Sequence, residues 1–315
     1  MSPDPDPSPP PPLRPRGRPM LRPGLRVTRR DADTLQVGLD PGCQTTLPDR
    51  PPVRALLAAL GDGDEPDLTD GAARAAWARL WDADLVVDRL RLSADLAGVS
   101  DGRRRQAISA AYAAHGKHAT QRLQARAEAR VAVRLPRDDA RAAHWGATVT
   151  GLLRDAGVGL APAGNDADAT VALVVTGTEP ARESLDPALA TGEPHLLLAS
   201  VEGRIRLGPF VVPGRTACLR CVDAHLDERD PRRSLVVHQY AEEQVAIGVP
   251  APDDPALTML ALAWAVRDLV SYVEGDRPAT WSATVRIEPD LGLHRHEWTR
   301  HPHCGCCWGD LLDVV

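Results

Sequence analysis

The sequence is poor in aromatic residues and in lysine. Aromatic residues make up 3% of the 315 positions, with a single Phe, and Lys117 is the only lysine among 37 basic residues. The hydrophobic cores must therefore be built from aliphatic side chains and the seven Trp. The net charge of −6 lacks the basic excess that a general nucleic-acid-binding protein needs to displace counterions, so we expect no nucleic-acid partner.

Export and membrane signals are also missing. No signal peptide precedes the first folded segment, and no apolar run has the length that a bilayer requires. We therefore expect a cytoplasmic protein with no membrane partner. A chain of 315 residues exceeds the size of one ordinary core, so two domains are expected.

Cysteines occur as two close groups far apart in the chain. Cys218 and Cys221 form a C-x₂-C pair, and the motif HPHCGCCW contains Cys304, Cys306 and Cys307. Thiolates that arrive in pairs on tight turns can complete a tetrahedral zinc shell, and four of them leave no open position for water. A disulfide framework is the alternative, but it is typical of small secreted domains. The spacing therefore favours a structural zinc ion that fastens the C-terminal segment onto a domain core.

The N-terminal third predicts a disordered tail and a small module. Residues 1–23 hold ten of the 29 prolines and few apolar side chains, so we expect disorder there. Within 24–90, short alternating runs at 25–27, 34–39 and 44–47 predict a three-stranded meander, and apolar spacing predicts helices at 52–60 and 70–82. A strand at 85–87 follows. These elements indicate a winged-helix-like module.

Two functions suit such a module. A DNA-binding winged helix needs a basic recognition helix, whereas the 70–82 helix has Arg74 and Arg79 beside Asp70 and Asp82. The alternative is capture of an extended peptide on a strand edge. The pattern RRDADTLQVGLDP…LPDRPPVRALLAAL resembles the precursor-peptide recognition elements of ribosomally made, post-translationally modified peptides. That resemblance implies that a leader peptide pairs with the strand Gln44, Thr45, Thr46, Leu47 and contacts the helix that bears Arg74 and Arg79.

The rest of the chain predicts a helical connector at 91–128 and an α/β domain at 129–315. Strands are expected at 130–135, 158–160, 170–175 and 195–199, with a helix at 138–156, and this alternation indicates a parallel sheet. Asp254 and Pro255 begin a largely apolar helix that ends at Gly275, and a hairpin over 280–298 then brings the last cysteines to the first pair.

The first strand–helix turn of this domain has no glycine. It reads Arg134-Leu135-Pro136-Arg137-Asp138-Asp139, whereas a nucleotide phosphate requires a Gly-rich turn that lets the backbone approach it. Asp138 and Asp139 would repel a phosphate and are expected to cap the helix instead. We therefore expect no ATP at this turn.

The segment GPFVVPGRTACLRCVDAHL at 208–226, with HPHCGC near the end, is similar to E1-like (ThiF-like) cyclodehydratase C proteins of azole-forming peptide pathways. The resemblance implies a degenerate E1/ThiF-like, Rossmann-type domain, a homodimer, and a zinc site of Cys218, Cys221, Cys304 and either Cys306 or Cys307. The GPFVVPGRTACLRC and HPHCGC patterns favour Cys306, and the C-x₂-C spacing of active E1 enzymes favours Cys307. The sequence departs from active E1 enzymes because it lacks the glycine loop and an Asn-Leu-x-Arg-Gln segment.

The sequence thus supports one main hypothesis and two alternatives. The main one is a non-catalytic partner that binds a leader peptide and presents the precursor to a YcaO-type, ATP-dependent cyclodehydratase. The enzymatic alternative is an E1-like adenylyltransferase that acts on a peptide or carrier-protein carboxylate. The third is a winged-helix regulator with a zinc-clasped ligand domain, which the acidic charge disfavours.

Overall fold

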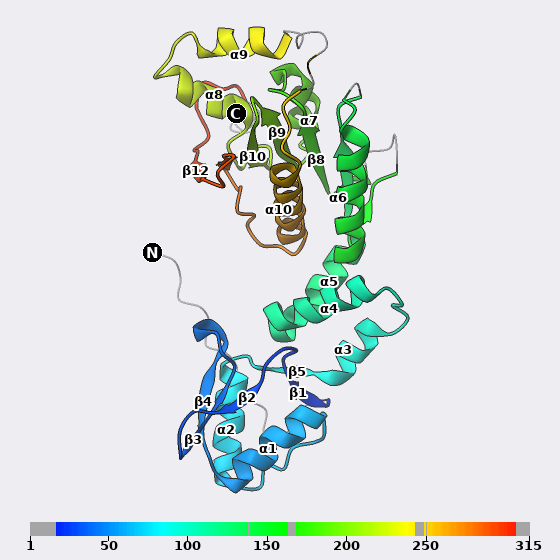
Figure 1. Cartoon of the computed structure of the whole chain (residues 1–315), viewed down its shortest axis with the longest axis vertical. Helices are drawn as coiled ribbons and strands as arrows, with labels where there is room; N and C mark the ends of the chain where they lie inside the picture. Colours follow the sequence, from blue (N-terminus) through cyan, green and yellow to red (C-terminus); the bar gives the residue numbers. More distant parts are fainter. Residues whose placement is uncertain (1–16, 138, 163–167, 243–248, 250, 307–315) are drawn as a thin grey trace, which may run out of the picture. The chain divides into compact units, whose positions relative to one another are not determined.

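The computed structural model describes residues 17–137, 139–162, 168–242, 249 and 251–306. The chain divides between Gln124 and Ala125 into two compact units, called unit 1 and unit 2 (Figure 1).

Unit 1 combines two small antiparallel sheets with helices. One sheet has the order β2-β3-β4 and the other pairs β1 with β5. The strands are β1 (Pro19–Leu21), β2 (Val27–Arg29), β3 (Thr34–Val37), β4 (Thr45–Pro48) and β5 (Val86–Asp88). The helices are η1 (Pro41–Cys43), α1 (Pro51–Asp62), α2 (Gly71–Asp82), α3 (Arg89–Leu96), α4 (Gly102–His115), η2 (Gly116–His118) and α5 (Ala119–Glu128), the last of which continues into unit 2.

The sequence explains where the first two helices begin and end. Prolines occupy the first positions of α1, where their missing N–H groups need no partner, and the helix ends at Gly63 in the left-handed conformation. Asp70 caps α2 by accepting hydrogen bonds from two backbone N–H groups. Both helices turn their apolar faces inward, and Leu47 of β4 is fully buried in the core that they share. The predicted meander and both predicted helices are present.

Two expected boundaries in this part of the chain are wrong. Residues 19–21 belong to the paired strand β1 rather than to a disordered tail, because Leu21 is buried in the core and Arg22 forms an ion pair with Asp84. The rest of the tail, 1–16, lies outside the described residues. The helical segment after residue 90 packs against β5 through Leu92, Ile108 and Tyr112, so up to Gln124 it belongs to unit 1 rather than forming a separate connector.

Unit 2 has a seven-stranded mixed sheet among its described residues, in the order β12-β11-β10-β9-β8-β6-β7. The pairs from β7 to β9 are parallel, and those from β9 to β12 are antiparallel. The strands are β6 (Arg130–Arg134), β7 (Gly159–Leu160), β8 (Val171–Thr176), β9 (His195–Val201), β10 (Arg204–Val211), β11 (Ala283–Ile287) and β12 (Leu293–Glu297). The helices are α6 (Ala142–Ala156), η4 (Arg182–Leu185), α7 (Asp186–Ala190), α8 (Leu219–Asp227), α9 (Arg233–Glu242) and α10 (Pro255–Val273).

The sheet is covered on both faces. On one face α6 and α10 form the main core with β6, β8, β9, β10 and β11, and on the other η4 and α8 form a smaller cluster. The four predicted strands, the helix capped by Asp254 and the C-terminal hairpin are present. The sequence predicted neither β10 nor the helices α7 and α9, and it placed the start of α6 four residues too early.

The expectation about apolar runs needs a correction. The 19-residue helix α10 is long and apolar enough to cross a membrane by length and composition. It packs instead on the sheet of unit 2, where Leu262, Ala265 and Leu269 are fully buried. Buried Asp268 on the same helix accepts hydrogen bonds from the backbone N–H groups of Ala279 and Thr280. These contacts are those of a core helix.

Candidate metal centre and peptide-binding edge

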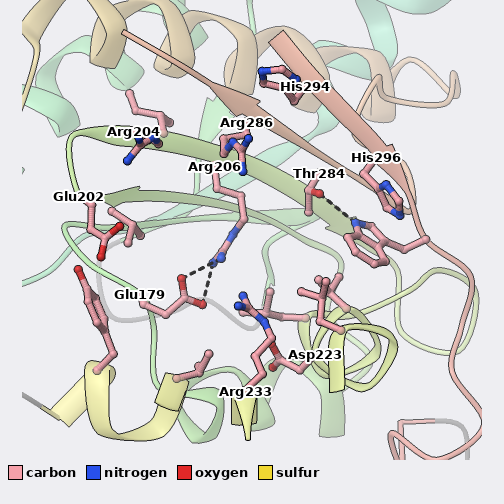
Figure 2. A pocket seen from close by; sticks show the side chains of 18 of the residues that line it. Glu179, Glu202, Arg204, Arg206, Asp223, Arg233, Thr284, Arg286, His294 and His296 are labelled. Atoms are coloured by element: carbon pink, nitrogen blue, oxygen red, sulfur yellow. Dashed lines mark hydrogen bonds and ion pairs between the residues drawn. The ribbon is translucent and has the colours of Figure 1, made fainter. Parts of the chain in front are cut away.

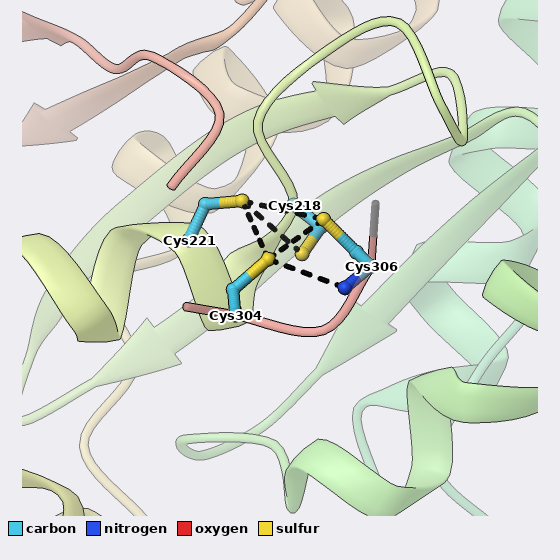
Figure 3. Close-up of side chains that lie close together, drawn as sticks. All are labelled: Cys218, Cys221, Cys304 and Cys306. Carbon is cyan, nitrogen blue, oxygen red and sulfur yellow. Dashed lines mark hydrogen bonds between the residues drawn. The ribbon is translucent and has the colours of Figure 1, made fainter. Parts of the chain in front are cut away.

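Four cysteines of unit 2 converge at the start of α8 (Figure 3). Cys218 is the N-cap residue of α8 and Cys221 lies in its first turn, whereas Cys304 and Cys306 come from the segment that follows β12. Cys221 Sγ lies 3.7 Å from Cys218 Sγ, 3.1 Å from Cys304 Sγ and 3.5 Å from Cys306 Sγ. The hairpin β11–β12 therefore returns the chain to the first pair, as predicted.

These distances are compatible with a zinc site. Zinc–sulfur bonds of about 2.3 Å in a tetrahedron separate the sulfur atoms by roughly 3.8 Å. The closest pair, Cys304 and Cys306, has its sulfur atoms 2.7 Å apart, which is well beyond a disulfide bond of about 2.05 Å. All four cysteines are free thiols.

The electrostatics of the cluster also suit a cation. A hydrogen bond with Cys221 raises the pKa of the Cys218 thiol to about 12. The pKa of Cys221 is lowered, because Cys218 and Cys306 form hydrogen bonds with its sulfur. The pKa of Cys306 is raised by its hydrogen bonds with Cys218 and Cys221. Without a cation the sulfur atoms resist ionising together, and a divalent ion at the centre removes that conflict.

Neighbouring histidines support the cysteine turn. The backbone N–H of His301 donates to Cys221 Sγ at 3.3 Å, and His301 Nε2 pairs with Glu228 at 3.1 Å. His225 on α8 bonds the carbonyl oxygen of Thr299 at 3.0 Å. Cys307, the alternative fourth ligand, lies outside the described residues. The cluster that the structure describes therefore has Cys306 as its fourth cysteine. Cys43 lies in unit 1 and takes no part.

The predicted peptide-binding strand β4 is an edge strand of unit 1. Its only partner among the described residues is β3, and Leu35 pairs with Leu47 in register. Asp49 donates its N–H to the carbonyl of Asp33. Because hydrogen-bonded and non-hydrogen-bonded residue pairs alternate along an antiparallel ladder, this bond shows which residues of β4 face β3. By that alternation Thr45 and Leu47 direct their backbone groups toward β3. Thr46 directs its N–H and C=O away from the sheet.

The side chains of β4 alternate between the two faces of the sheet. Leu47 is buried beneath the strand, and Thr45 is on the same face. Gln44 and Thr46 are on the opposite face, where Gln44 accepts a hydrogen bond from Gln36. The strand thus combines an anchored inner face with an outward backbone edge.

The two arginines predicted to contact the peptide differ in their environment. Both are exposed on α2, which packs beside β4. Arg74 donates to the carbonyl oxygens of Leu68 and Thr69 at 3.0 and 2.5 Å, so its guanidinium fastens the turn before the helix. Arg79, one turn from the end of α2, is the more available of the two for a ligand.

The turn between β6 and α6 is occupied by an ion pair. The Asp139 carboxylate accepts hydrogen bonds from the backbone and side chain of Arg141, which lowers the pKa of Asp139. Arg141 lies over the Trp145 ring and reaches the carbonyl oxygen of Gly177. Asp139 was expected to cap the helix, which is wrong because α6 begins only at Ala142. Asp138 lies outside the described residues.

A groove in unit 2 was not predicted. It has a volume of about 810 Å³ and lies between α8 and α9 on one side and the outward face of β10, β11 and β12 on the other (Figure 2). Polar residues occur at every second position of these strands, at Arg204 and Arg206 in β10 and at Thr284 and Arg286 in β11, and this pattern predicts the polar face. It could have been found once β10 was recognised.

Beneath the groove lies a buried ion-pair network. Arg182 is 8% exposed and donates to Asp223 from Nε and Nη2 at 2.5 and 2.8 Å. Its Nη1 lies 2.7 Å from Glu179, which also receives two hydrogen bonds from Arg206. Burial opposes ionisation of Glu179, but Arg206 and Arg182 together keep its pKa below the usual range. Asp223 therefore holds the Arg182 guanidinium in place.

Arg182→Gln is expected to destabilise the protein by about 3–5 kcal/mol, because the substitution leaves two buried carboxylates short of their shared cation. Urea unfolding of the full chain measures this loss. Arg295→Gln is the control, since its ion pair with Glu297 is exposed and such pairs contribute at most about 1 kcal/mol. A loss below 1 kcal/mol for Arg182→Gln would show that the network does not support the fold.

Comparison with known proteins shows the fold. No family model and no curated protein matches the sequence. Over 92% of this chain, the structure is similar to that of the heterocyclase TruD, with a TM-score of 0.66 and 18% identity. A heterocyclase in complex with substrate and cofactor gives a TM-score of 0.66 and 16% identity. The chain spans 42% and 39% of the lengths of these two proteins.

A second similarity covers nearly the whole of both chains. Escherichia coli MccB bound to ATP matches 92% of this chain and 99% of its own, with a TM-score of 0.57 and 12% identity. Its complex with the peptide MccA gives a TM-score of 0.58 and 12% identity. The chain therefore has the α/β fold of the E1-like proteins MccB and TruD, and the resemblance stated from the sequence is confirmed at the level of the fold.

Proposed function

We propose that this protein is a non-catalytic, leader-peptide-binding partner that presents a ribosomal precursor peptide to a YcaO-type cyclodehydratase for thiazoline or oxazoline formation. The observation that carries the proposal is the outward backbone edge of β4 at Thr46. An extended peptide can add to such an edge through main-chain hydrogen bonds, while neighbouring side chains select its sequence. Unit 1 then acts as a winged-helix-like recognition module, with Arg79 of α2 beside the added strand.

Unit 2 has a structural role in this proposal. Zinc bound by Cys218, Cys221, Cys304 and Cys306 joins the C-terminal segment to α8, and the domain forms a homodimer in the cytoplasm. Four thiolates would leave zinc no open coordination site, so the ion would take no part in the reaction. The cyclodehydratase active site belongs to the YcaO partner. The similarity to TruD, of which this chain spans about two-fifths, supports this division.

The alternative is an ATP-dependent adenylyltransferase that acts on a peptide or carrier-protein carboxylate. The similarity to MccB, which binds ATP and MccA, favours it. The turn between β6 and α6 opposes it, because this turn lacks glycine and carries the carboxylate of Asp139, which would repel a phosphate.

Pyrophosphate exchange separates the two functions. We expect the purified protein to show only background ATP–pyrophosphate exchange with the precursor peptide. Adding it to the YcaO protein is expected to raise the rate of precursor dehydration, seen by mass spectrometry as a loss of 18 Da per ring, by at least about tenfold. Robust exchange by this protein alone would establish the adenylyltransferase and contradict the proposed role.

A further inference from the structure

A row of basic side chains crosses three strands of the groove in unit 2. Arg206 of β10 pairs in register with Arg286 of β11, which pairs with His294 of β12, so all three share one face (Figure 2). Like charges placed directly opposite each other destabilise a sheet. Glu179 holds Arg206, and Glu288 holds Arg286. Each of these two arginines therefore has a carboxylate partner within the chain, which makes the close approach of the two guanidinium groups tolerable.

Arg233 faces the groove from its other wall, on α9. Its Nε is buried and has no hydrogen-bond partner within the described residues, and the same is true of Arg206 Nε. A buried N–H without an acceptor is costly, so the positions of these two arginines are not explained by contacts of Nε within the described residues. The lining contains six arginines and four carboxylate residues, in a protein whose net charge is −6. Arginines therefore outnumber carboxylates in this lining, although the chain as a whole is acidic.

The groove also has apolar walls and an open strand beside it. Leu226, Val236 and Trp298 line it, and Val236 is 55% exposed. At the margin of the sheet, β12 is exposed along its whole length and has β11 as its only partner among the described residues. A small inorganic anion would leave the apolar wall unused. A peptide with alternating acidic and apolar side chains would use both.

We propose that the groove between α8–α9 and β10–β12 binds an acidic, extended peptide segment, whose carboxylates contact Arg206, Arg233 and Arg286. This site is separate from the β4 edge of unit 1. The proposal rests on the proposed function only in the choice of a peptide as the ligand. Its test uses a synthetic peptide without a leader sequence, so the two proposals can fail independently.

The test is fluorescence anisotropy of the full-length protein with a fluorescein-labelled hexapeptide of sequence Glu-Leu-Glu-Leu-Glu-Leu. We expect Arg233→Gln and Arg286→Gln each to weaken binding at least tenfold, and Arg233→Lys to weaken it less. The Gln-Leu-Gln-Leu-Gln-Leu peptide should also bind at least tenfold more weakly. Arg154→Gln is the matched control because Arg154 is exposed on α6, away from the groove, and this variant should bind as the wild type does.

Three outcomes would overturn the proposal. Equal binding by the wild type and both glutamine variants, with their melting temperatures unchanged, would show that the peptide does not use the groove. Equal affinity for the glutamine peptide would show that carboxylates are not recognised. If pyrophosphate bound with the same dependence on Arg233 and Arg286 while neither peptide bound, the groove would be a site for inorganic anions instead.

Discussion

Replacing Cys218 or Cys221 with serine is expected to abolish zinc binding and to lower the melting temperature by at least about 8 °C. The ligands come from α8 and from the segment after β12, so the metal is bound only by the folded chain, and its binding free energy adds to folding stability. A free zinc concentration a thousandfold above the dissociation constant contributes about 4 kcal/mol. In a domain of 150–250 residues each kcal/mol corresponds to about 2–4 °C.

Metal analysis and thermal melts of the purified protein provide the measurement, with about one zinc expected per chain. Cys43→Ser is the matched control, since Cys43 lies in unit 1 and should be neutral for zinc content. Comparing Cys306→Ser with Cys307→Ser by zinc content identifies the fourth ligand, and we expect the loss with Cys306. Wild-type protein that carries no zinc and melts unchanged in the presence of a chelator would rule out the metal clasp.

Thr46→Pro is expected to weaken leader binding by at least tenfold, or about 1.4 kcal/mol, while the protein remains folded. Proline has no N–H to donate, and the N–H of Thr46 points away from β3 toward the open edge. The internal ladder of unit 1 therefore stays intact. The affinity is measured by isothermal titration calorimetry. The ligands are synthetic leader peptides, taken from the N-terminal halves of short reading frames beside the gene.

Two further proline variants make this experiment specific. Val27 on β2 also directs its N–H outward, because Thr28 is the β2 residue that bonds Gln36 in the alternating ladder. Val27→Pro is therefore the matched control on the opposite edge of the same sheet and should leave affinity unchanged. Thr45→Pro removes a donor that faces β3, so we expect it to destabilise unit 1. If Val27→Pro weakened binding and Thr46→Pro did not, the leader would bind the other edge.

Local signals in the sequence predicted much of the fold. Asp254 and Pro255 mark the start of α10 because an N-cap carboxylate and a first-turn proline suit a helix end whatever surrounds it. Val171–Thr176 could be recognised because a buried parallel strand is apolar on both faces. The cysteine spacing likewise predicted that the two cysteine groups meet, but it left the fourth sulfur open between Cys306 and Cys307.

Features that depend on tertiary contacts were missed. β1 was assigned to a disordered tail because three residues near many prolines carry too little pattern, and its pairing with β5 supplies the order. Asp139 follows the pattern of a helix cap, but its bonds with Arg141 replace that role. The network around Arg182 joins residues 41 positions apart, and no local pattern reveals such a pair.

Backbone amide exchange of Thr46 tests the central claim most directly. Exchange of the full chain is followed by NMR with and without the leader peptide, with the Val27 amide as an internal reference. If the leader adds to β4, the Thr46 amide donates to it, and its exchange should slow by at least tenfold while that of Val27 is unchanged. A saturating leader peptide that leaves Thr46 exchange unaltered would contradict the account.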